Sequence, residues 1–189
     1  MRTLKIAIFI LTLTSCHFNV KVTKTYELYF DESTYQTFNK AISAYQNQRS
    51  QLADSLFSVV IDKSKEKLSS TMPIEFNPYY YRGHNNIDLD KYDQAINDFE
   101  QVVSDTTTNT DILLARTEAF KMLKKYDTAI VLCNRLINLG FDSSIVLGQR
   151  GICYYQQGQK EKACSDLTLA KKLATSDVSY LDKFLTGCK

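Results

Sequence analysis

The chain has 189 residues, of which 44% are hydrophobic and 23% are charged, and its formal net charge is +2. This composition excludes a disordered chain and a membrane protein with many spans, and so small a charge does not suggest a nucleic-acid partner. Two His are too few for a multi-His metal site, and the scarcity of Gly (6) and Pro (2) beside 12 Tyr and 10 Phe favours packed helices over a β-sandwich.

The N-terminus has the features of an export signal over residues 1–15. Arg2 and Lys5 precede an apolar run that is far shorter than the ~20 residues needed to span a bilayer as a helix. The run ends in Leu-Thr-Ser-Cys, with the Cys at position 16, and this motif resembles the lipobox of bacterial lipoproteins. The resemblance implies cleavage after Ser15 and a diacylglycerol group on the Cys16 sulfur. The alternative is a chance Cys after an ordinary secretory signal.

The predicted lipid on Cys16 and the residue that follows it indicate where in the cell envelope the protein lies. Two or three acyl chains hold a protein on a membrane, whereas one chain does not. His17 stands where lipoproteins of the inner membrane carry Asp, and the resemblance therefore favours the outer membrane, facing the periplasm. We expect residues 16–33 to be a tether that lies extended on the body of the protein.

An internal repeat of constant length organises the body of the chain. Ala95, Ala129 and Ala163 are equally spaced and stand at the same place in three consecutive segments that align without gaps. The segments are 76–109, 110–143 and 144–177.

These segments resemble the tetratricopeptide repeat (TPR), a helix-turn-helix unit of about 34 residues. Large, small and Ala positions of the family pattern are matched, for example by Tyr79, Gly83 and Ala95 in the first repeat. Asn86 departs from the pattern by replacing an aromatic residue, and Leu136 departs by replacing a small one. The resemblance implies an all-α fold, a TPR-type α-solenoid in which each repeat buries its apolar face against its neighbours.

Further helices are expected at both ends of the three repeats. A degenerate helical pair is predicted over 34–67, with Ala53 at the Ala position, although its first helix fits the pattern better one residue later. The greater distance from Ala53 to Ala95 predicts an insertion loop over 68–75. A capping helix is predicted over 178–189, with Tyr180, Leu181 and Phe184 facing inward.

The sequence contains no catalytic, phosphate-binding or metal-binding pattern, so we expect neither an enzyme nor a cofactor. Four Cys remain after Cys16 is assigned to lipid. Cys164 and Cys188 are the candidate disulfide, because their bond would tie the cap to the last repeat in an oxidising compartment. Cys133 and Cys153 are interpreted as small buried hydrophobic residues. Four free thiols are the alternative.

In the TPR family the inner faces of the first helices line a concave groove, and the resemblance assigns that role to one set of residues here. The candidate groove residues are Asn77, Tyr80, His84, Ile87, Asp88, Asp111, Leu114, Glu118, Lys121, Met122, Ile152, Tyr155 and Gln156. Apolar side chains at these places suggest a protein or peptide partner. The tether or the N-terminal pair could cover the groove instead.

Two functions follow from these expectations. The first is a membrane-anchored scaffold or adaptor that binds another protein in the bacterial cell envelope. The alternative is an accessory subunit that binds a small ligand or a glycan in the groove, for which paired aromatic rings flanked by carboxylates would be the mark. Tyr80 with Asp88 is its only indication in the sequence.

Overall fold

The computed structural model describes residues 25–69, 71–102, 108–141 and 143–188. These residues form nine α-helices and no strand. The helices are α1 (Glu32–Gln46), α2 (Ser50–Ser64), α3 (Pro78–Asp88), α4 (Tyr92–Val102), α5 (Thr110–Met122), α6 (Tyr126–Asn138), α7 (Ser144–Gln156), α8 (Lys160–Leu173) and α9 (Asp182–Leu185). Short 3-10 helices occupy Thr25–Leu28, Ile74–Phe76 and Ser179–Leu181.

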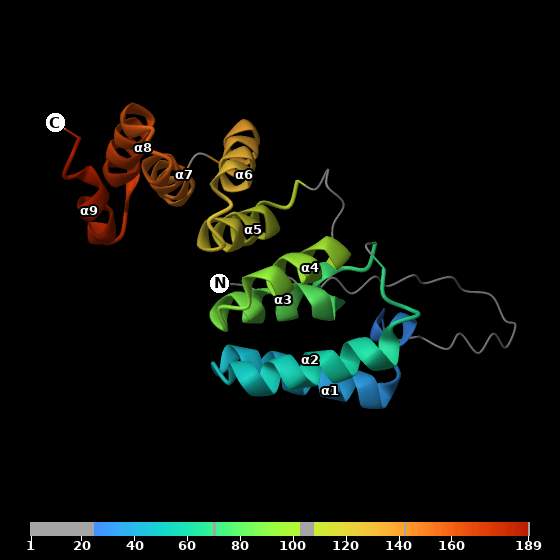
Figure 1. Ribbon diagram of the computed structural model, residues 1–189. Helices are drawn as coiled ribbons and strands as arrows, with labels where there is room; N and C mark the ends of the chain where they lie inside the picture. Colours follow the sequence, from blue (N-terminus) through green and yellow to red (C-terminus); the bar gives the residue numbers. More distant parts are fainter. Residues whose placement is uncertain (1–24, 70, 103–107, 142, 189) are drawn as a thin grey trace, which may run out of the picture.

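The helices pack as consecutive pairs. Each of the pairs α1–α2, α3–α4, α5–α6 and α7–α8 packs internally, and α2, α4 and α6 each pack on the first helix of the next pair. The pairs therefore rise as a staircase from α1 to α8 (Figure 1). This arrangement confirms the expected all-α solenoid.

The turns inside the pairs repeat one backbone conformation. Gln48, Asp90, Lys124 and Gly158 all have positive φ, between 57° and 75°. The last three are separated by one repeat length each, and Ala53 follows Gln48 at the same distance as Ala95 follows Asp90. Both helices of the first pair therefore have the same repeat register as the other pairs. The shift by one residue that the sequence suggested for the first helix is not present.

Small residues permit the close packing within the pairs. A Cβ on Gly83 would lie 2.8 Å from Phe99, and a Cβ on Gly151 would lie 2.7 Å from Leu167. Ala41, fully buried, takes the same place in the first pair. The helices of each pair thus approach so closely that a larger side chain would overlap a neighbour.

Polar side chains cap several first helices of the pairs. Asp31 accepts a hydrogen bond from the Thr34 backbone N–H, and Asn109 and Ser143 cap α5 and α7 in the same way. A capping side chain satisfies a backbone N–H group that the helix itself leaves unpaired. The cap at Asp31 explains why α1 begins at Glu32, two residues before the predicted start of the pair.

The end of the predicted tether is folded onto α1. The rings of Tyr26 and Tyr35 stack with their centroids 3.7 Å apart, and those of Phe30 and Phe38 are 5.2 Å apart. Tyr26 and Phe30 are buried. Since Phe38 holds the same repeat position as Tyr80, these contacts cover the groove-facing side of α1. The predicted insertion loop likewise carries structure, since Ile74–Phe76 is a 3-10 helix.

The C-terminal cap is shorter than the predicted helix. It consists of Ser179–Leu181 and α9, and Leu181 is fully buried against the core of the last pair. Phe184 is half-buried, but Tyr180 is 53% exposed, so the expectation that its ring faces inward was wrong. The cap nevertheless covers the last layer of the solenoid.

Candidate binding groove

The structure brings the candidate groove residues together in two groups. Tyr80 and His84 on α3 meet Asp111 on α5. The Tyr80 hydroxyl donates to the Asp111 carboxylate, and His84 Nε2 lies 3.3 Å from Asp111 Oδ2. The imidazole is held edge-on between the rings of Tyr80 and Phe99, with centroids 4.7 and 5.0 Å away. These contacts fix Tyr80 and His84 in place.

The first group is a packed cluster in which the Asp111 carboxylate contacts an uncharged imidazole and an uncharged phenol. Burial lowers the pKa of His84, and the nearby Asp111 and Asp88 carboxylates only partly oppose the effect. Burial and the bond to Asp111 both raise the pKa of Tyr80. His84 is therefore neutral at pH 7, and no proton-transfer role follows from its surroundings.

The second group lines a hollow of about 330 Å³ between α5, α7 and the C-terminal cap. Lys121 and Met122 on α5 face Ile152 and Gln156 on α7. Five further residues that the repeat pattern does not assign to the groove also line it: Lys124, Tyr126, Tyr180, Lys183 and Phe184. Tyr155, which is 43% exposed, lies beside it with its ring centroid 5.2 Å from that of Phe184.

The remaining candidates belong to neither group. Asn77 is 1% exposed and caps α3, so its assignment to the groove was wrong. Ile87 and Leu114 are half-buried and pack against the core. Glu118 is half-buried and Asp88 is exposed.

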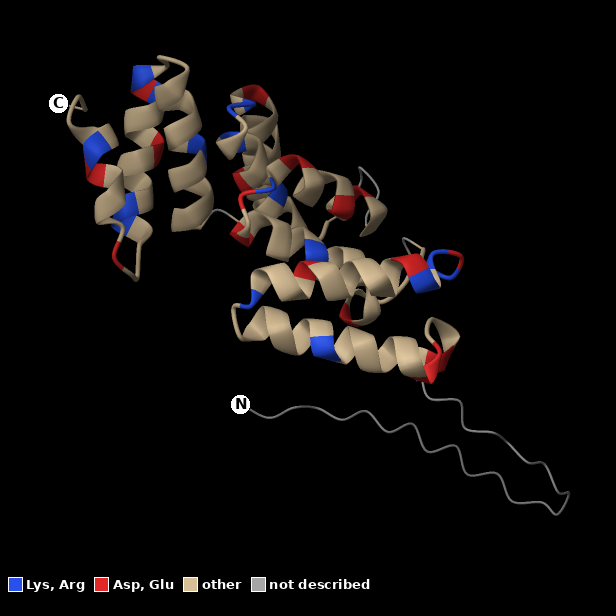
Figure 2. Cartoon of the chain, turned by 60° about the horizontal axis from the view of Figure 1, so that its bottom comes forward, with Lys and Arg blue, Asp and Glu red and all other residues tan. Residues whose placement is uncertain are grey.

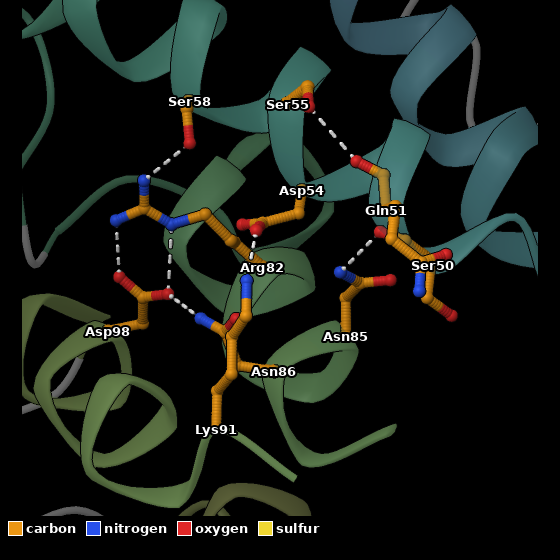
Figure 3. Close-up of polar contacts among 10 residues, drawn as sticks. All are labelled: Ser50, Gln51, Asp54, Ser55, Ser58, Arg82, Asn85, Asn86, Lys91 and Asp98. Atoms are coloured by element: carbon orange, nitrogen blue, oxygen red, sulfur yellow. Dashed lines mark hydrogen bonds and ion pairs between the residues drawn. The ribbon is translucent and has the colours of Figure 1, made fainter. Parts of the chain in front are cut away.

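A repeated polar network holds the layers in register. Arg82 binds Asp98 through two hydrogen bonds of 2.9 and 2.6 Å and reaches Ser58 on α2 at 3.0 Å, while Asn86 donates to the same carboxylate at 2.9 Å (Figure 3). The Asn86 that departs from the family pattern is thereby explained. Bidentate guanidinium–carboxylate pairs are among the stronger polar contacts in proteins.

The same network recurs two repeats later. Arg150 binds Asp166 at 2.6 and 2.8 Å and reaches Asn134 on α6 at 2.7 Å. In both repeats the guanidinium joins the two helices of one pair to the second helix of the preceding pair. Lys91–Asp54 and Asn85–Ser50 add two more contacts between the first pairs (Figure 3).

The middle repeat has the Arg without its carboxylate. Arg116 stands one repeat length from both Arg82 and Arg150, but Leu132 occupies the place of the Asp. Arg116 is only 8% exposed, and its Nε has no hydrogen-bond partner. No described carboxylate forms an ion pair with it. A buried charge without a partner is costly, so the middle layer lacks a stabilising contact that its neighbours have.

The cysteines fall into two kinds. Cys164 and Cys188 form a disulfide that ties the end of the cap to α8. Cys133 and Cys153 are fully buried thiols, and burial raises their pKa values to about 12 and about 11. Cys16, the predicted lipid-bearing residue, lies outside the described residues.

The described part of the chain has neither a membrane-spanning helix nor a metal-binding cluster. Within it, no helix is long and apolar enough to cross a membrane. Nor do its His, Cys, Asp and Glu side chains gather in a group that could hold a metal ion. Acidic and basic residues are interspersed along the helix pairs in Figure 2.

The order of the helices, their pairing and the repeated turns define a helical-repeat protein of the solenoid class. Its fold is of the TPR type, as comparison with solved structures shows. MamA from Desulfovibrio magneticus RS-1 superimposes with a TM-score of 0.68 at 15% identity, covering 84% of this chain and 86% of that one. The thermophilic TPR protein TTC0263 from Thermus thermophilus gives 0.60 at 16% identity, covering 82% of each chain.

A third similar structure is YrrB, described as a TPR protein with an unusual peptide-binding site. It superimposes with a TM-score of 0.57 at 17% identity, covering 72% of this chain and 66% of YrrB. No protein-family model and no curated protein matches the sequence. At these identities the likeness establishes the fold.

Proposed function

We propose that this protein is a scaffold or adaptor that binds a partner protein or peptide in its groove and is held at the bacterial envelope by lipid on Cys16. The observation that carries the binding role is the exposed apolar surface on the groove side of α5 and α7. Met122 is 48% exposed and Tyr155 is 43% exposed, and neither is needed to fill the core. Apolar side chains beside a hollow are typical of protein-binding sites.

The peptide-binding site named for YrrB supports the same kind of partner, since the two proteins share the fold. The glycan alternative has less support. Its indication was Tyr80 with Asp88, but the Tyr80 hydroxyl is bound to Asp111 and its ring is enclosed by Tyr81 and His84. A ring fixed in this way presents little free face to a sugar.

The binding role is tested by capturing partners from a bacterial envelope extract. We expect the double variant Met122→Ser/Tyr155→Ser to lose partners that the unchanged protein retains, because it removes the exposed apolar contacts while leaving the core intact. A matched control is Val131→Ser/Leu169→Ser, which removes exposed apolar residues from α6 and α8. Equal recovery of the partners with both variants would place the binding surface elsewhere.

The anchor is tested separately. Cys16→Ala is expected to move the protein from the membrane fraction to the soluble fraction, because acyl chains supply the membrane affinity and each buried CH₂ contributes about 0.8 kcal/mol. Sedimentation of membranes with immunodetection measures the distribution. Continued recovery of Cys16→Ala with the membranes would contradict lipid anchoring at this residue.

A further inference from the structure

The hollow beside the C-terminal cap has an unusual distribution of charge. Three ammonium groups lie around it, those of Lys121, Lys124 and Lys183. No Asp or Glu is among the nine residues that line it. Its surface is therefore positive although the whole chain carries a net charge of only +2.

The carboxylates nearest in sequence form no ion pair with these lysines. Asp182 precedes Lys183 in the chain but is bound by Lys171 at 2.5 Å, and Asp127 accepts a hydrogen bond from Gln157 at 2.7 Å. Lys183 lies over the Phe184 ring, 4.9 Å from its centroid. Within the described residues, none of the three lysines of the hollow has an ion-pair partner.

The floor between the lysines is apolar and accessible. Met122 and Tyr180 are 48% and 53% exposed, and Ile152 and Phe184 are half-buried beside them. A volume of about 330 Å³ is large enough to receive one or two large side chains of a partner. Anionic groups flanking an apolar anchor would meet complementary charge around this floor.

We infer that this hollow is the part of the groove that selects the partner, and that its occupant is an acidic peptide segment in which Asp or Glu flanks a large apolar residue. The inference rests on the proposed binding function and specifies its partner. The apolar side chain enters between α5, α7 and α9, and the flanking carboxylates pair with Lys121, Lys124 and Lys183. Lys124 and Lys183 are exposed, so their contribution to binding falls as salt rises.

The experiment is binding of the full-length protein, in detergent, to an array of terminally blocked random peptides. We expect the bound peptides to be enriched in Asp and Glu beside Leu, Phe or Tyr. Lys121→Glu/Lys124→Glu/Lys183→Glu should weaken binding to these peptides at least about tenfold, because three attractions become repulsions. Replacing each Glu of a bound peptide by Gln should likewise weaken the binding of that peptide to the unchanged protein.

The matched control is Lys65→Glu/Lys67→Glu/Lys172→Glu, which makes the same change in net charge at exposed sites away from the hollow. It should bind the acidic peptides as the unchanged protein does. Enrichment of neutral or basic peptides, or of none, would overturn the inference. So would equal weakening by the control, or binding of the hollow lysines to anionic lipid vesicles in place of peptides.

These outcomes are separable from failure of the proposed function. If Met122→Ser/Tyr155→Ser abolishes partner capture while the triple lysine variant leaves it unchanged, the groove binds a partner but the acidic class is wrong. If neither variant changes capture, the groove itself is not the binding surface.

Discussion

Replacing the repeated Arg by Met is expected to destabilise the protein in the first and third repeats and to stabilise it in the middle repeat. Arg82→Met and Arg150→Met should each lower the free energy of unfolding by about 3 kcal/mol, because each leaves a buried carboxylate without its cation. The Asp98 and Asp166 side chains concerned are only 5% and 9% exposed. Arg116→Met should instead raise it by about 1 kcal/mol, since it replaces a guanidinium whose buried Nε has no hydrogen-bond partner by an apolar side chain.

Chemical denaturation followed by circular dichroism measures the three differences under one set of conditions. The comparison is internally controlled, because the substitution, the helix position and the change in charge are the same each time. A loss at Arg116 equal to that at Arg82 and Arg150 would mean that Arg116 has a partner of its own. The double change Arg150→Met/Asp166→Leu should recover much of the loss of Arg150→Met, because it removes the stranded carboxylate.

The constant repeat length was sufficient to predict the fold, because one small residue per repeat fixes where two helices can touch. Ala95, Ala129 and Ala163 mark those contacts in sequence, and all three are fully buried in the structure. Stacking then follows, since a single pair cannot bury its apolar face alone. The frame of the first pair was harder to predict, because Phe38 is apolar at a groove position that the preceding segment covers.

The arginine network could have been found in the same spacing but was not. Arg82, Arg116 and Arg150 recur at the repeat length, and Asp98 and Asp166 at twice that distance. Each Arg–Asp ion pair joins two helices through residues that are well separated in the chain, so no local sequence motif indicates it. The recurrence of a charged residue at one repeat position, usually taken for a solvated face, was the available indication.

The candidate groove was predicted only in part, for two physical reasons. The family pattern assigns groove positions by helix geometry alone, and it therefore included Asn77, whose side chain caps α3 instead. It could not include Tyr180, Lys183 and Phe184, because the path of the cap after α8 is set by its own turn and by the disulfide. Those three residues complete the hollow.

Loss of the Cys164–Cys188 disulfide is expected to be the other large effect. The bond joins two residues that are 24 positions apart in the chain, and the loop it closes contains most of α8 and the whole cap. In the chain-entropy account, opening a loop of this size lowers the free energy of unfolding by about 3 kcal/mol. Cys164→Ser/Cys188→Ser should therefore be less stable than the unchanged protein by this amount, and its cap should exchange backbone amide hydrogens faster than α7.

Dithiothreitol provides the matched test, because it should act on one bond alone. Cys133 and Cys153 are buried thiols whose raised pKa values keep them neutral and unreactive. The reductant should destabilise the unchanged protein by the same amount as the double Ser substitution does. It should have no effect on the double Ser variant. An unchanged denaturation midpoint on reduction would contradict the prediction.

The Cys164–Cys188 disulfide also bears on peptide binding at the hollow and on the cellular location of the protein. Tyr180, Lys183 and Phe184 belong to the cap that it secures, so reduction should also weaken peptide binding at the hollow by loosening one of its walls. A structural disulfide persists in the periplasm but not in the reducing cytosol. A protein whose hollow depends on Cys164–Cys188 is thus suited to the exported position that we propose, and binding that is insensitive to reduction would separate the hollow from the cap.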